Sequence, residues 1–186
     1  MAVSSLVAAS SGKTMYRITL TSGTSWTVPA GVTYVNVILY GGGGGSGGHN
    51  PRTGGAGAGG TGGTTTFTGA TSALGGTGGI AADYNLGYAT GYYGGSASSP
   101  TNNTGLGAKG SWIHNNSASM GIHPAPSAIE GYSGQIVSST LSTTPGASIA
   151  YSIGAGGTAG SSGASGEYKL SGVAGASGKI DIEYWV

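Results

Sequence analysis

Alternating apolar and polar residues predict β-strands in the first part of the chain. Three apolar residues alternate with polar neighbours over 16–20: Tyr16, Ile18 and Leu20. A second set shares one face of the stretch VTYVNVILY: Val35, Val37 and Leu39. This period of two is typical of a strand that turns one face toward a core. Because Ile38 and Tyr40 lie on the opposite face, we expect the second strand to be buried on both sides.

The same alternation returns near the C-terminus. Ile149, Tyr151 and Ile153 alternate within ASIAYSIGAGG. The closing stretch GKIDIEYWV has one apolar face: Ile180, Ile182, Tyr184 and Val186. Asp181 and Glu183 lie on its other face. No segment shows a helical period over ten or more residues, so the sequence predicts an all-β fold, an antiparallel β-sandwich in which the first and last strands meet.

Long glycine runs interrupt these strands. The run YGGGGGSGG follows the strand over 34–40 directly, and glycines are also dense over 41–63, 75–79 and 154–166. Glycine weakens ordinary strands and helices because it loses the most freedom on folding. Two interpretations remain open. The runs are flexible linkers, or they form extended helices with three residues per turn that pack side by side, as in polyglycine II.

Composition favours a folded chain with neutral partners. Charged residues make up only 6% of the sequence, yet it contains 11 Tyr and 3 Trp. A net charge of +1 gives no electrostatic basis for binding nucleic acid or an anionic membrane. The absence of cysteine excludes disulfides and zinc–thiolate sites and fits folding in a reducing cytosol. We expect neither a cleaved signal peptide nor a membrane-spanning segment.

The domain organisation predicted from these patterns has three parts. Residues 1–14 are small and uncharged apart from Lys13, and we expect an arm that docks onto a partner or is disordered alone. Residues 15–186 form one glycine-rich sandwich domain. Within it, residues 81–139 form a variable central insertion.

Four stretches in order resemble one protein family. They read SWTVPAGVTYVNVILYGGGGGSGG, GGTGGTTTFTGATSALGGTGG, TTPGASIAYSIGAGG and GASGKIDIEYWV. Together they resemble the glycine-rich domain of bacteriophage tail-fibre and related virion proteins. The resemblance implies a β-sandwich with glycine-rich loops in a virion protein that is assembled in the bacterial cytoplasm. It also implies other virion proteins as partners, contact with a host surface glycan or outer-membrane receptor, and the trimeric state usual for tail fibres.

Several motifs of catalytic or cofactor chemistry are present only in part. The spacing G-x-G-x-x-G occurs in the glycine run, but no helix follows it to hold a pyrophosphate. The three histidines lack the spacing of a metal site. Asp181 and Glu183 would lie ~7 Å apart on one strand, a separation that glycosidases use, but a solvated strand face explains them better. We therefore expect no enzyme activity, no cofactor and no metal.

The central insertion holds the best candidates for a binding site. It combines aromatic rings, which stack on sugars, with amides that form adaptable hydrogen bonds. The candidate receptor-binding residues are Tyr84, Tyr88, Tyr92, Tyr93, Asn102, Asn103, Trp112, His114, Asn115 and Asn116. The alternative is that these aromatic residues form the core of the insertion.

The expected function is therefore that of a tail-fibre or tail-tip protein that binds a neutral glycan on the host surface. One alternative is a purely architectural virion protein: a capsid decoration, a head fibre or a tail plug. Ice binding is a weaker alternative, because TTTFTGATSALGG does not sustain the regular tripeptide repeat that it requires.

Overall fold

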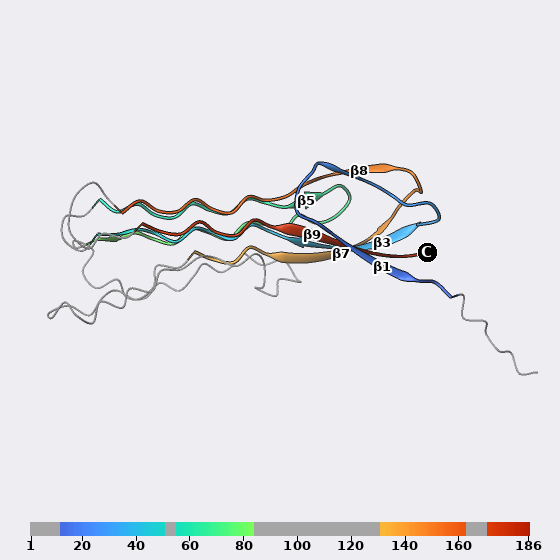
Figure 1. The fold of residues 1–186 in the computed structure, drawn as a ribbon, viewed down its shortest axis with the longest axis horizontal. Helices are drawn as coiled ribbons and strands as arrows, with labels where there is room; N and C mark the ends of the chain where they lie inside the picture. The colour runs from blue at the N-terminus through green and yellow to red at the C-terminus, as the bar shows by residue number, and fades with distance from the viewer. Residues whose placement is uncertain (1–11, 51–54, 84–130, 163–170) are drawn as a thin grey trace, which may run out of the picture.

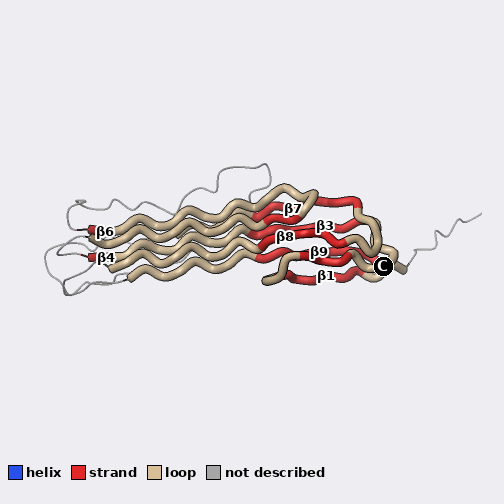
Figure 2. The backbone as a smooth tube through the Cα atoms, turned by 90° about the horizontal axis from the view of Figure 1, so that it is seen from above, coloured by secondary structure: helices blue, strands red, loops and turns tan. Residues whose placement is uncertain are grey.

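A computed structural model describes residues 12–50, 55–83, 131–162 and 171–186. The molecule is elongated, with most strands at one end and long glycine-rich segments at the other (Figures 1 and 2). Its strands are β1 (Met15–Leu20), β2 (Ser25–Thr27), β3 (Tyr34–Tyr40), β4 (His49–Asn50), β5 (Thr66–Phe67), β6 (Ala82–Asp83), β7 (Ile136–Ser142), β8 (Ser148–Ser152) and β9 (Lys179–Trp185). The described ranges contain no helix long and apolar enough to cross a membrane.

Two antiparallel sheets form a sandwich, as the alternation predicted. One sheet has the strand order β1-β9-β3-β7 and the other has the order β2-β8-β5. The first and last strands pair along their whole length, from Met15 opposite Trp185 to Leu20 opposite Ile180. The ladder continues beyond β1, because Thr14 and Val186 exchange backbone hydrogen bonds of 2.8 and 3.1 Å. The arm predicted over 1–14 therefore joins the sheet at its last residue.

The core lies between the two sheets and consists of the predicted inward faces. The four-stranded sheet contributes fully buried side chains: Val35, Val37, Leu39, Ile180 and Ile182. From the other sheet, Phe67 and Trp26 pack with their ring centroids 6.3 Å apart. Trp26 also lies 6.2 Å from Tyr184, which joins the two layers. The prediction that β3 is buried on both faces is wrong, since Ile38 and Tyr40 are only half-buried.

Two tight turns in the sandwich depend on glycine. Gly31 has a φ of 80°, and Val32 donates a backbone hydrogen bond of 3.2 Å to Pro29. Gly146 has a φ of 79°, and it follows Pro145 in the turn between β7 and β8. A positive φ at the third residue of a turn is the geometry of type II, which favours glycine there.

Beyond the sandwich, six glycine-rich segments run side by side as a rod (Figure 2). They are residues 41–48, 55–64, 74–81, 131–135, 153–162 and 171–178. Segment 41–48 continues β3 directly, and all of its residues are buried. This placement confirms that the run YGGGGGSGG is ordered by its neighbours.

Segment 41–48 bonds to its neighbours with a period of three. The N–H groups of Gly42, Gly45 and Gly48 all donate to segment 55–64. Those of Gly41 and Gly44 donate to segment 131–135, while those of residues 43 and 46 donate to segment 171–178. Three residues per turn and hydrogen bonds between chains define a polyglycine II arrangement.

Carbonyl groups of segment 41–48 complete the pattern with the same period. Gly76 and Gly79 donate to residues 42 and 45, and Gly157 and Gly160 donate to residues 43 and 46. Five segments thus surround 41–48, in the order 131–135, 74–81, 55–64, 153–162 and 171–178. Donor and acceptor neighbours alternate around this ring, and the carbonyls of Gly41 and Gly44 face the remaining side, between 131–135 and 171–178.

The rod admits almost no side chains between its segments. A Cβ atom at Gly44 would collide with the carbonyl group of Thr77, and one at Gly45 would collide with that of Thr158. Ser46 is accommodated because its hydroxyl oxygen accepts a hydrogen bond of 2.8 Å from the N–H of Val173. Glycine is therefore required by close backbone approach, and the hydrogen bonds follow from that approach.

The segments alternate in direction and meet at one end of the rod. At that tip, β4 pairs in parallel with β6, so that His49 lies opposite Ala82 and Asn50 opposite Asp83 (Figure 2). The chain enters the sandwich again through segment 131–135 and β7. The fold therefore takes residues 81–83 and 131–139 into the rod and the sheet, although the sequence placed them in the insertion.

We expect Gly44→Ala to destabilise the protein by about 2–3 kcal/mol, because its methyl group would push the central segment away from Thr77. Thermal and urea unfolding followed by circular dichroism would measure the change. Gly12→Ala is the matched control, since a Cβ at Gly12 meets nothing within 4 Å. The control should change the free energy of unfolding by about 0.5 kcal/mol or less. Equal stability of the two variants would contradict the packing described above.

Candidate functional site

The receptor-binding residues predicted from the sequence, from Tyr84 to Asn116, lie outside the described part of the chain. What the structure provides is the place where that stretch is attached. The described chain stops at Asp83 at the tip of the rod and resumes at Gly131. Tyr132 accepts a hydrogen bond of 2.7 Å from Gly44, so the chain resumes partway back along the rod.

The described chain stops at two further places at the same tip. The described chain also stops at Asn50, the end of β4, and at Ser162, whose neighbour Ser161 bonds to Gly57. Gly57 in turn accepts from Gly48, close to β4. By contrast, Thr14 and Val186 pair at the opposite end of the molecule, beside the C-terminus marked in Figure 1. The rod therefore separates Asn50, Asp83 and Ser162, where the described chain stops, from Thr14 and Val186.

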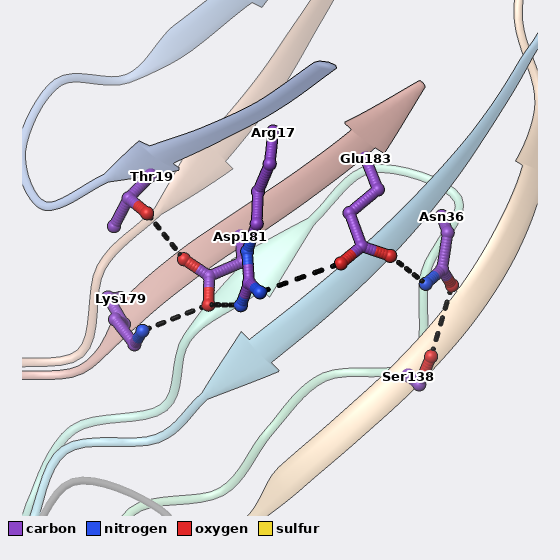
Figure 3. Close-up of polar contacts among 7 residues, drawn as sticks. All are labelled: Arg17, Thr19, Asn36, Ser138, Lys179, Asp181 and Glu183. Carbon is purple, nitrogen blue, oxygen red and sulfur yellow. Dashed lines mark hydrogen bonds and ion pairs between the residues drawn. The ribbon is translucent and has the colours of Figure 1, made fainter. Parts of the chain in front are cut away.

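A second cluster of functional groups lies on the outer face of the four-stranded sheet (Figure 3). Asp181 on β9 is fully buried there by the side chains around it. Its carboxylate accepts hydrogen bonds from Arg17 (2.7 Å), Thr19 (2.6 Å) and Lys179 (2.9 Å). The expectation of a solvated strand face is therefore wrong for Asp181, because two half-exposed cations and a hydroxyl group enclose it.

The environment of Asp181 has opposing effects on its pKa. Burial raises the pKa, but the hydrogen bonds from Thr19, Lys179 and Arg17 outweigh burial and lower it to about 2. The hydrogen bond between Arg17 and Asp181 raises the pKa of Arg17, and the negative charge of Asp181 raises it further. Asp181 is thus held ionised and shielded, which makes it unsuitable as a proton donor to a substrate.

Glu183 extends the cluster toward the opposite edge of the sheet. One of its oxygens lies 3.7 Å from Arg17, and the other accepts a hydrogen bond of 2.9 Å from Asn36. Asn36 accepts a hydrogen bond of 3.1 Å from Ser138 on β7. The result is a continuous polar network across all four strands (Figure 3). Strand alternation shows which face Arg17 and Asn36 occupy, but pairing them with these acids requires the register between distant segments.

Metal-ligating side chains are not clustered in the described ranges, where no group of at least three His, Cys, Asp or Glu residues is suited to an ion. Of the three histidines, His49 lies at the tip in β4. His114 and His123 lie outside the described residues.

The network around Asp181 predicts how stability depends on pH. Because its pKa falls from 3.8 in the unfolded chain to about 2 in the folded protein, its contribution is present above about pH 4 and is lost as the pH falls toward 2. We expect Asp181→Asn to cost roughly 1–2 kcal/mol at pH 7, a value reduced by the partial exposure of Arg17 and Lys179. Urea unfolding at pH 7 and at pH 2.5 would measure the free energy of unfolding of the wild type and of Asp181→Asn.

The difference between wild type and Asp181→Asn should shrink at the lower pH, and Thr19→Val should show a smaller change in the same direction. A difference that is independent of pH would show that the ionised form of Asp181 does not contribute.

The chain matches no protein-family model, no curated protein and no solved structure.

Proposed function

We propose that the protein is a structural component of a bacteriophage virion, of the tail-fibre or tail-tip type, that binds a neutral glycan on the host cell surface. The central Tyr-, Asn- and Trp-rich stretch carries the binding residues. In this proposal the sandwich end joins the rest of the virion, and the rod holds the binding stretch away from it.

One observation carries the proposal. The described chain stops at Asp83, at the tip of the rod, just before the stretch that contains Tyr84 to Asn116, and it resumes at Gly131, partway back along the rod. Thr14 and Val186 pair at the opposite end of the molecule. A rigid spacer between an attachment end and a recognition end is the arrangement that a host-binding fibre protein requires. The rod suits this purpose because each of its segments is bonded to its neighbours at every third residue.

Composition supports a neutral ligand. The whole chain has a net charge of +1, and the candidate stretch combines aromatic rings with Asn amides. Rigid aromatic side chains supply contact area at low entropic cost, and amides supply hydrogen bonds to hydroxyl groups. Sequence resemblance to the glycine-rich domain of tail-fibre proteins supports the same function.

Binding of fluorescently labelled protein to a panel of bacterial strains tests the proposal. We expect strain-selective binding that Trp112→Ala weakens by roughly tenfold or more, as for an aromatic residue at the centre of an interface. Leu74→Ala is the control, because Leu74 is an exposed apolar side chain on the rod, 43% accessible. This control should bind as wild type does.

Two results would count against the proposal. Binding that Trp112→Ala and a replacement of residues 84–130 by a short Gly/Ser linker both leave unchanged would place the receptor site elsewhere. Absence of binding to every strain would favour the purely architectural role in the virion.

A further inference from the structure

The outer face of the four-stranded sheet also presents an apolar row at the end farthest from the rod. Side chains alternate along a strand, so every second residue counted from Arg17 in β1, from Asn36 in β3 and from Glu183 in β9 lies on this face. Met15 lies opposite Trp185 in the register of β1 and β9. Val35 lies opposite Tyr184, so the next pair outward is Tyr34 with Trp185. Met15, Trp185 and Tyr34 therefore form one row across three strands.

All three side chains of this row are exposed. Their accessible fractions are 55% for Met15, 43% for Trp185 and 62% for Tyr34. None of them belongs to the core or packs against it, in contrast to Tyr184 and Trp26. Two aromatic side chains on adjacent strands thus remain open to a ligand.

The next row inward consists of hydrogen-bonding groups in fixed positions. Arg17 contacts both Asp181 and Glu183, and Glu183 also accepts a hydrogen bond from Asn36 (Figure 3). These interactions restrict the rotamers of side chains that would otherwise be mobile on a surface. Arg17 keeps further N–H groups for a ligand, because a guanidinium group carries five of them.

The charges of this face are balanced. Arg17 and Lys179 are matched by Asp181 and Glu183, and the side chain of Arg17 remains 49% exposed. Such a face attracts neither a strongly anionic nor a strongly cationic ligand. Its chemistry combines aromatic surface with directional donors and acceptors, which suits a molecule that has both apolar faces and hydroxyl groups.

We propose that this outer sheet face is a second binding site, specific for a neutral saccharide. The sugar ring stacks on Trp185 and Tyr34, and its hydroxyl groups form hydrogen bonds with Arg17, Glu183 and Asn36. Large aromatic side chains supply most of the contact area in such a site, and a few placed polar groups orient the ligand.

The dimensions of the apolar row favour a small ligand over a protein partner. A stable protein interface buries about 800 Å² on each partner and usually has an apolar centre. Here the apolar part is a single row of three side chains, and the charged network begins immediately behind it. A second copy of the chain would have to bury that network without new partners for it.

This site lies on the sandwich and shares no residue with the stretch 84–130, which begins after Asp83 at the tip of the rod. The inference therefore does not depend on the proposed receptor-binding role of that stretch. Either one can fail without the other, and different variants test them.

An array of immobilised neutral hexose and N-acetylhexosamine oligosaccharides, probed with the full-length protein, tests the inference. We expect at least one glycan to be retained, with apparent affinity reduced about tenfold or more by Trp185→Ala and by Tyr34→Ala. Trp185→Phe should keep part of the binding, because it preserves an aromatic face. Arg17→Ala should weaken binding as well.

Two controls separate this site from other surfaces and from loss of folding. Tyr16→Ala removes an exposed aromatic residue, 48% accessible, that stacks on Tyr184 on the opposite face of the same sheet. Trp112→Ala tests the stretch attached at the tip. Tyr16→Ala should keep glycan retention, and Trp112→Ala should keep the part of the retention that Trp185→Ala removes. Thermal unfolding should show that Trp185→Ala and Tyr34→Ala remain folded.

Three outcomes would overturn the inference. They are retention of no neutral glycan by the wild type, retention that is unchanged in folded Trp185→Ala and Tyr34→Ala, and retention lost only in Trp112→Ala. Sedimentation provides an independent check. A wild-type dimer that Trp185→Ala converts to a monomer would assign the face to self-association and also overturn the inference.

Discussion

Close approach between backbones is the constraint on which the rod depends. The N–H groups of segment 41–48 reach their neighbours at hydrogen-bond distance because glycine occupies the positions at which a Cβ would meet a neighbouring backbone. At Gly62, a Cβ would collide with Gly42, and at Gly154 a Cβ would collide with Gly63. The conformational freedom that glycine loses on folding disfavours each such segment by itself. Hydrogen bonds to several neighbours at once offset that loss, so the segments are stable only together.

The sandwich and the rod are connected through the same chains, and Tyr40 marks the change between them. Up to Tyr40, β3 pairs with two strands in one plane. From Gly41 onward the hydrogen bonds point in several directions around the chain. Buried Thr65 links the two arrangements. Its hydroxyl donates a hydrogen bond of 2.7 Å to the carbonyl of Tyr40 and accepts one of 3.0 Å from the N–H of Gly154. The sheet thus fixes the starting positions from which the glycine segments extend.

Alternation in the sequence predicted β1, β3, β8 and β9 but not β7, and the glycine runs indicated the rod only in kind. Alternation at Val35, Val37 and Leu39 reports which face enters the core, and burial follows that pattern. A run of glycines has no side chains whose pattern could specify a neighbour, so the order of segments around 41–48 cannot be read from it. The two-residue strand β5 is too short for a period, although Phe67 from it belongs to the core.

The outer sheet face shows a different limit of sequence reasoning. The positions of Asp181 and Glu183 on one face of β9 were predicted correctly, but the enclosure of Asp181 was not. That enclosure depends on Arg17 and Thr19, which are more than 160 positions away in the chain and become neighbours only through the register of β1 with β9.

The same register places Trp185 beside Met15 and, through β3, beside Tyr34. The ion pairs at Asp181 contribute only modestly to stability, because Arg17 and Lys179 are half-exposed. Their larger effect is to hold Arg17 and, through Glu183, Asn36 in fixed positions next to the exposed aromatic residues. A surface organised in this way loses little further side-chain entropy when a ligand binds, which is the physical advantage of preorganisation.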